Sequence, residues 1–172
     1  MQDSQKELLQ DYKIEIRTYQ DVIVEDIPGF LKKIDIITQE KENSIIQLLD
    51  SDYICGKKHL RQGISQAFKA FNEKQNFAKD KGLEICVRLS AQKQISQALK
   101  ILGIKKQGNI TVVYVDTTQE QIKLVENLLK TRNDSLLEQY DEEKIIKAYN
   151  LISSNNIVDE INEKIALLSL KN

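Results

Sequence analysis

The chain has 172 residues, of which 41% are hydrophobic, and its 25 Lys and Arg residues nearly balance its 26 Asp and Glu residues, so the formal net charge is −1. This length predicts one domain over residues 1–172. The sequence has no apolar run near the ~18 residues of a membrane span and no signal-peptide layout, so we expect a cytoplasmic protein without membrane contact. The net charge alone argues against nucleic-acid binding, because such domains usually have a basic balance.

Residues suited to catalysis or metal binding are few. Cys55 and Cys86 lie in apolar stretches without CxxC spacing, and His59 is the only histidine. The sequence therefore supports neither a disulfide nor a metal site. We find no GxSxG, HExxH, GxGxxG or P-loop pattern, and we expect neither enzymatic activity nor a cofactor. His59 lies off the apolar stripe of its helix, so we expect it to face solvent or a groove, with or without a role.

The first half of the chain predicts two strands and two helices. Alternating apolar and polar residues at 12–18 predict a strand, and residues 44–49 form a weaker strand candidate. A short helix is expected at residues 30–37. From residue 58 to 71, apolar residues recur at helical spacing on one face, which predicts an amphipathic helix.

The second half predicts further strands and helices. Residues 83–89 interleave apolar residues with Glu84 and Arg88, which favours a strand, and Ser90 then stands at the N-cap position of a helix that ends at Gly103. Residues 109–116 form the clearest strand. A capping box of Thr118 and Gln121 opens a helix to residue 129, and Asp141 caps another to about residue 150.

A polar turn at residues 153–156 precedes the last predicted helix. Because strand-to-strand connections vary in length and the C-terminal third is helical, we predict an α+β fold. Its sheet is expected to be mixed, mostly antiparallel, and to have about four or five strands packed with helices.

Charge is distributed unevenly along the chain. Residues 57–106 contain twelve Lys and Arg residues against three acids, a net of +9, and the remainder carries 13 basic and 23 acidic residues, a net of −10. A helix N-terminus within a basic region favours phosphate. Ser90, Gln92, Lys93 and Gln94 stand at the predicted terminus, and the glutamines could also read unpaired bases. The alternative is a solvated, lysine-rich surface without a ligand.

The last helix has two apolar faces. At helical spacing, one face is predicted to be core; it comprises Ile157, Val158, Ile161, Ile165 and Leu168. Ala166, Leu167 and Leu170 lie nearly opposite, flanked by acids, and are predicted to bind a partner protein. The alternatives are a helix buried on both sides and a frayed terminus.

The sequence resembles a known family. The run KKHLRQGISQAFKAF (57–71), the run GLEICVRLSAQKQISQALKILGI (82–104), the segment NITVVYVD and the ending VDEINEKIALLSLKN resemble the TPRKB-like subunit of the KEOPS complex, over about residues 44–172. The resemblance implies an α+β fold and a non-catalytic subunit that binds the small atypical kinase/ATPase of that complex. It also implies recruitment of tRNA through the 3′ CCA end, for threonylcarbamoyl-adenosine formation in tRNAs that read codons beginning with A.

The resemblance also implies site residues. The family's S-G-x-R-Q-I turn falls on residues 90–95, with Ala91 in place of Gly and Lys93 in place of Arg, and the latter change loses bidentate geometry. Ile95 fits both the core and a nucleotide pocket. The predicted RNA-binding set comprises Lys57, Lys58, His59, Arg88, Ser90, Gln92, Lys93, Gln94 and Ile95. A second hypothesis is a protein-only regulator of the kinase, with the lysines as plain surface.

Overall fold

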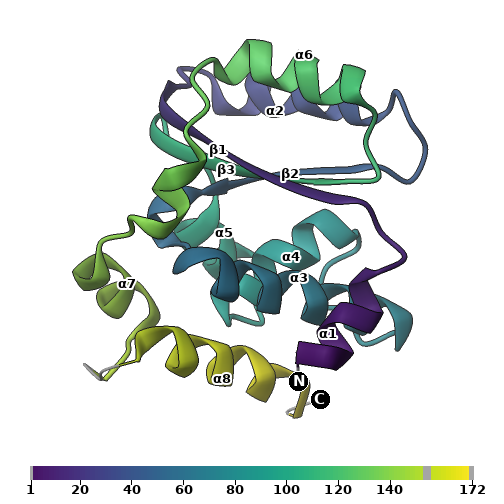
Figure 1. Cartoon of the computed structure of the whole chain (residues 1–172). Helices are drawn as coiled ribbons and strands as arrows, with labels where there is room; N and C mark the ends of the chain where they lie inside the picture. The colour runs from purple at the N-terminus through teal and green to yellow at the C-terminus, as the bar shows by residue number, and fades with distance from the viewer. Residues whose placement is uncertain (1, 153–155, 171–172) are drawn as a thin grey trace.

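A computed structural model describes residues 2–152 and 156–170 of the chain, and Figure 1 shows its layers. The sheet has the order β1-β3-β2, formed by β1 (Ile14–Ile23), β2 (Ile45–Asp50) and β3 (Gln107–Val115). Both pairings are antiparallel. The α+β class is therefore confirmed, whereas the predicted four or five strands and mixed sheet are wrong for the described residues.

The missing strand is the segment 83–89, which lies instead within helix α4 (Lys81–Ser90). Asp80 caps this helix, since its carboxylate accepts a hydrogen bond from the Leu83 N–H at 2.8 Å. Glu84 and Arg88 then pair one turn apart, at 2.7 Å. From Glu84 to Ser90 every side chain is buried, and a segment that is buried on all sides carries no periodicity that separates a helix from a strand.

The other expected elements of the first half are confirmed, with shifted ends. Helix α2 (Ile27–Thr38) begins after Asp26, whose side chain accepts from the Gly29 N–H at 3.1 Å. Helix α3 (Gly56–Asn72) is the predicted amphipathic helix. Helix α1 (Gln2–Leu9) was not predicted from the sequence.

The second half contains α5 (Ile95–Leu102), α6 (Gln119–Leu129), α7 (Glu142–Tyr149) and α8 (Ile157–Leu170). The capping box before α6 and the Asp141 cap of α7 are confirmed. The end of α5 at Gly103 is also confirmed, because Leu102 is its last residue and Gly103 its C-cap. A Cβ at Gly103 would lie 2.5 Å from the Leu99 carbonyl oxygen, so glycine suits this position. Short 3₁₀ helices occupy Ser51–Tyr53 (η1) and Asp134–Glu138 (η2). Of the predicted polar turn, residues 153–155 lie outside the described residues.

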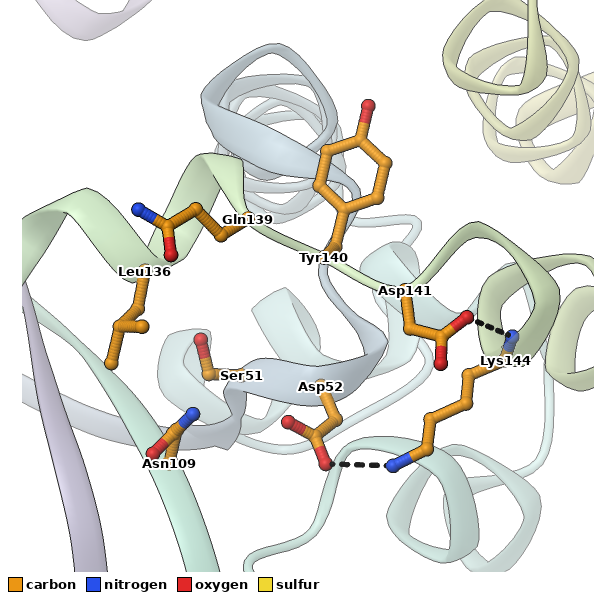
Figure 2. A pocket seen from close by; sticks show the side chains of 8 residues that line it. All are labelled: Ser51, Asp52, Asn109, Leu136, Gln139, Tyr140, Asp141 and Lys144. Atoms are coloured by element: carbon orange, nitrogen blue, oxygen red, sulfur yellow. Dashed lines mark hydrogen bonds and ion pairs between the residues drawn. The ribbon is translucent and has the colours of Figure 1, made fainter.

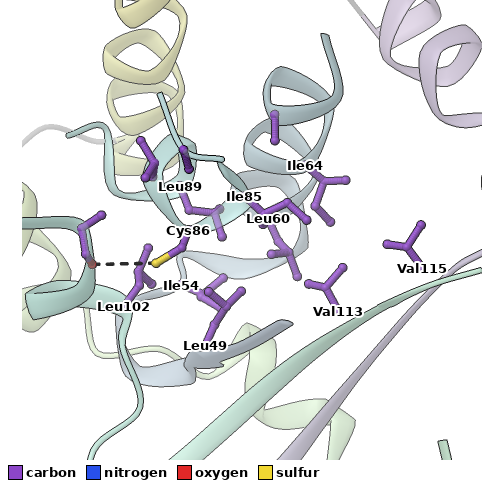
Figure 3. Packing of buried hydrophobic residues seen from close by; sticks show 14 of the residues in the cluster. Leu49, Ile54, Leu60, Ile64, Ile85, Cys86, Leu89, Leu102, Val113 and Val115 are labelled. Atoms are coloured by element: carbon purple, nitrogen blue, oxygen red, sulfur yellow. Dashed lines mark hydrogen bonds between the residues drawn. The ribbon is translucent and has the colours of Figure 1, made fainter. Parts of the chain in front are cut away.

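Two hydrophobic clusters fill the two faces of the sheet. Helices α2 and α6 cover one face, and α3, α4 and α5 cover the other, where Figure 3 shows the packing around Leu60, Ile85 and Val113. A third cluster joins α7 and α8 to Cys55. Burial raises the pKa of the Cys55 thiol to about 11 and that of Cys86 to about 12, so both thiols stay protonated near neutral pH.

The described residues contain no helix that is both long and apolar enough to span a bilayer. In the same residues, His, Cys, Asp and Glu side chains form no group of three or more that could hold a metal ion.

Candidate nucleic-acid and partner interfaces

His59 joins two segments of the predicted RNA site, although its ring is fully buried. The Cys55 N–H donates to Nδ1 at 2.9 Å, so Nε2 carries the proton and donates to the Leu89 carbonyl at 3.0 Å. Burial lowers the pKa of His59 to about 4, so the ring is neutral at physiological pH. The expectation that His59 faces solvent is therefore wrong, because the turn before α3 and the end of α4 close over it.

Lys57 and Lys58, which directly precede His59, are exposed at the start of α3. Lys58 pairs with Asp159 of α8 at 3.0 Å, and both side chains are more than half exposed. Such a surface pair contributes little to stability. The basic start of α3 therefore lies beside the first turn of the C-terminal helix.

The Ser90–Ile95 segment connects α4 to α5, and it differs from the prediction. Ser90 is fully buried as the last residue of α4: its hydroxyl donates to the Val87 carbonyl at 2.7 Å and accepts from the Gln92 N–H at 3.1 Å. Helix α5 begins only at Ile95, after Gln94, which makes no side-chain cap. The predicted N-cap role of Ser90 is thus wrong, because α4 occupies the segment that was expected to be a strand.

Ala91 ends α4 in the left-handed conformation, with φ 57° and ψ 28°. Glycine adopts this conformation without penalty, whereas a Cβ makes it unfavourable. This geometry gives a physical reason for the Gly of the family's turn at this position.

Arg88 was included in the predicted RNA set, but its side chain is 1% exposed. The guanidinium pairs with Glu84 at 2.7 Å, donates to the Gln75 carbonyl at 3.1 Å and reaches the Ser169 hydroxyl at 3.3 Å. It also lies 4.5 Å from the centre of the Phe77 ring. All of these contacts are internal, so in this conformation Arg88 holds the loop before α4 and the end of α8 in place and does not face a ligand.

Glu84 completes this buried cluster. Its Oε1 accepts hydrogen bonds from the Phe77 and Ala78 N–H groups at 2.9 and 2.7 Å, and its side chain is 0% exposed. A buried carboxylate with three donors is a satisfied group. Its role could be read from the sequence only through the spacing of four residues between Glu84 and Arg88.

The nine predicted RNA-binding residues therefore divide by exposure. His59, Arg88 and Ser90 are buried, Gln92 and Ile95 are half-buried, and the exposed side chains are those of Lys57, Lys58, Lys93 and Gln94. Because the His59 ring of α3 bonds to the Leu89 carbonyl of α4, the exposed residues at the start of α3 lie close to those in the turn after α4. Half-burial of Ile95 agrees with both of its expected environments, the core and the surface.

The predicted partner residues lie on the outer side of α8. Leu167 and Leu170 are 42% and 80% exposed, and Ala166 is half-buried. The opposite side is core, as expected: Ile157, Ile161, Ile165 and Leu168 are buried, while Val158 is half-buried. The helix is thus buried on one side only, and its alternative as a helix buried on both sides is wrong.

A small pocket of about 90 Å³ lies where η1, η2 and α7 meet (Figure 2). Asp52 and Lys144 pair across it at 3.3 Å, and Asp141 is engaged in capping α7. A larger groove of about 570 Å³ lies between α1, β1, α3 and η2, and sequence reasoning missed it. No signal in the sequence could have found it, since it depends on how four separate elements pack.

Comparison with known proteins agrees with the expected resemblance. The family model for the kinase binding protein CGI-121 matches residues 19–169. The Regulatory protein Cgi121 of Methanocaldococcus jannaschii is 36% identical over 128 residues, which cover 73% of this chain and 83% of that protein. The match begins within β1 and ends within α8, and it includes every residue of both predicted interfaces except Leu170. The chain therefore belongs to the CGI-121 family of kinase-binding proteins, the family of the TPRKB-like subunits.

Proposed function

We propose that this protein is a cytoplasmic, non-catalytic subunit of the KEOPS complex that recruits tRNA to the complex and binds its small atypical kinase/ATPase. In this role it holds the tRNA by its 3′ CCA end during threonylcarbamoyl-adenosine formation, and it carries out no reaction itself. Membership of a kinase-binding family supports the protein partner. The observation that carries the RNA assignment is the His59 bridge between α3 and α4, which brings the exposed Lys57 and Lys58 close to the turn with the exposed Lys93 and Gln94.

The RNA-facing surface combines cations with amide groups. Lys57 and Lys58 supply positive charge at the start of α3, and Lys93 and Gln94 extend from the turn that follows α4. Lysines neutralise phosphates without reading sequence, and glutamine side chains can bond to the edges of unpaired bases. This composition suits a short single-stranded end such as CCA.

Filter binding of tRNA to the full chain tests this surface. Lys93→Glu should weaken binding and lower the slope of log affinity against log salt by about 0.7, the value for one single-strand phosphate contact. Lys123→Glu, an exposed position on α6, is the matched control and should leave affinity unchanged. Removing CCA from the tRNA should weaken binding of the wild-type chain to a similar degree. Equal affinity for trimmed and intact tRNA would contradict the site.

The kinase-facing surface is the outer side of α8. Leu170 and Leu167 present apolar surface to solvent, and a partner that covers this surface gains binding free energy from its removal from water. Leu167→Glu and Leu170→Glu should each abolish co-purification with the kinase subunit. Leu124→Glu, at a leucine of α6 that is 37% exposed, should retain it. If all three variants co-purify alike, the kinase binds elsewhere.

A second candidate function is a protein-only regulator of the kinase. Burial of His59, Arg88 and Ser90 favours it, because a third of the predicted RNA set is committed to internal contacts. Under this hypothesis the α8 variants still abolish co-purification, while Lys93→Glu and CCA removal both leave tRNA retention by the assembled complex unchanged. The two hypotheses therefore differ only in the RNA arm of the experiment.

A further inference from the structure

The groove between α1, β1, α3 and η2 lies apart from the outer face of α8. Its volume of about 570 Å³ falls within the range of ligand-binding sites. The floor is apolar and the rim is charged; the lining residues include Tyr12, Ile14, Ile16, Ile64, Leu137 and Arg61. The apolar side chains at the base of the groove can exclude water, and the charged side chains at its rim can orient a charged ligand.

One wall of the groove is an open sheet edge. On the outer side of β1, the Thr18 N–H donates to Asp134 at 3.0 Å and the Thr18 carbonyl accepts from the Asn133 N–H at 2.7 Å. Backbone groups of alternate residues point the same way, so those of Ile14 and Ile16 also point away from β3. Within residues 2–152 and 156–170 these four groups have no hydrogen-bond partner.

The charges on the rim are not equivalent. Asp134 pairs with Arg132 at 2.7 Å and bonds to Thr18, and Glu138 accepts from the Lys57 N–H at 2.6 Å. Both carboxylates are therefore engaged. The side chains of Lys57 and Arg61 are exposed, lie one helical turn apart and form no ion pair within the described parts of the chain. In the described residues these two cations face one lining carboxylate without an ion pair, that of Glu138, so the unmatched charge of the groove is positive.

We propose that this groove binds an extended, acidic peptide segment of a partner protein, which adds a strand to the free edge of β1. The Ile14 and Ile16 backbone groups supply main-chain hydrogen bonds, alternate apolar side chains of the peptide cover Ile16 and Leu137, and its carboxylates pair with Lys57 and Arg61. Strand addition requires a peptide backbone, and an apolar floor beside an open edge favours a peptide over RNA. This groove is separate from the proposed kinase surface, and it shares only Lys57 with the proposed CCA surface.

The probe is a fluorescent peptide of about seven alternating Glu and Val residues, a length that spans ~23 Å in the extended state. Fluorescence anisotropy should show binding to the full chain. Arg61→Glu should weaken it at least tenfold, and Lys69→Glu, an exposed lysine of the same helix that does not line the groove, should leave it unchanged. A control peptide with Lys in place of Glu should bind far more weakly.

Hydrogen exchange separates strand addition from other modes. In the wild-type chain the Ile14 and Ile16 amides should exchange quickly and become protected when the Glu-Val peptide is bound, while the bonded Thr18 amide serves as the internal reference. The proposal is overturned if the peptide fails to bind at about 1 mM, which corresponds to ~4 kcal/mol of binding free energy, if Arg61→Glu has no effect, or if those amides stay unprotected. Protection by an RNA oligonucleotide ending in CCA, without protection by the peptide, also overturns it.

Discussion

The two faces of the sheet are covered by helices of different character. Helices α2 and α6 pack on one face and contain none of the residues proposed to bind RNA or kinase, whereas all of those residues lie in α3, α4, α5, α8 or the turn between α4 and α5. The ion pairs of the two helical layers also differ, in how much of their side chains is exposed. Arg88 and Glu84 are 1% and 0% exposed, while Arg17 and Glu126, on the α6 side, are 17% and 28% exposed. The layer with the proposed interfaces also depends on buried polar contacts for its shape.

The largest expected difference between the faces concerns the buried ion pair. Arg88→Met leaves the Glu84 carboxylate buried without its cation, so we expect the free energy of unfolding to fall by about 3–5 kcal/mol. Urea denaturation measures this loss. Arg17→Met, on the α6 side, should cost less than about 1 kcal/mol because the side chains of its partners, Glu15 and Glu126, are 26% and 28% exposed and solvent screens the pair. Combining Arg88→Met with Glu84→Gln should recover part of the loss, and equal costs for Arg88→Met and Arg17→Met would contradict the comparison.

His59 should make the α3–α4 contact sensitive to acid. The folded ring has a pKa of about 4, below the usual value of about 6.5, so between these values the unfolded chain binds the proton more readily. This contribution to stability is complete above pH 6.5 and declines as the pH falls toward 4, by up to about 3 kcal/mol. Urea titrations at several pH values should show a weaker pH dependence for His59→Asn than for the wild type. An equal dependence would mean that the ring titrates normally.

On the α6 face, the Tyr19 hydroxyl links Tyr114 at 2.8 Å and Glu126 at 2.9 Å. Tyr19→Phe removes both bonds and leaves the Tyr114 hydroxyl buried without a partner, so we expect a loss of about 1–2 kcal/mol. Tyr114→Phe should cost less, because Tyr19 keeps its bond to Glu126. In co-purification and filter binding, both variants should bind kinase and tRNA as the wild type does. Reduced binding would show that the two faces are coupled.

The smallest expected effect is a gain in stability at the turn between α4 and α5. Ala91 has φ 57°, so Ala91→Gly relieves the unfavourable contact of Cβ and should raise the free energy of unfolding by about 1 kcal/mol or less. Thermal denaturation measures the change. Asn150→Gly, at another left-handed residue with φ 54°, is a control outside the proposed RNA surface, and Asn tolerates this conformation better than Ala. A larger gain at Asn150 than at Ala91 would contradict this explanation.

The sequence predicted best the elements that have one buried face and a capping signal. The capping box of Thr118 and Gln121 predicted helix α6, and apolar residues at helical spacing predicted α8. Prediction from the sequence failed at α4. There, charged residues are buried with their partners, and every side chain from Glu84 to the end of the helix is buried. Because this segment was predicted as a strand, the next helix was predicted to begin at Ser90. The anion site was therefore expected at a helix start that the structure does not have.

The sequence by itself determined the family, the α+β class, the presence of most helices and the separation of positive and negative segments, because these depend on local spacing and composition. Only the tertiary structure decided which of the predicted site residues reach solvent. The Lys57 and Lys93 side chains do, whereas the Arg88 cation turns inward to Glu84 and the neutral His59 ring to the Leu89 carbonyl. The physical reason is that burying a charged or polar group depends on partners from other elements, and no local pattern specifies them.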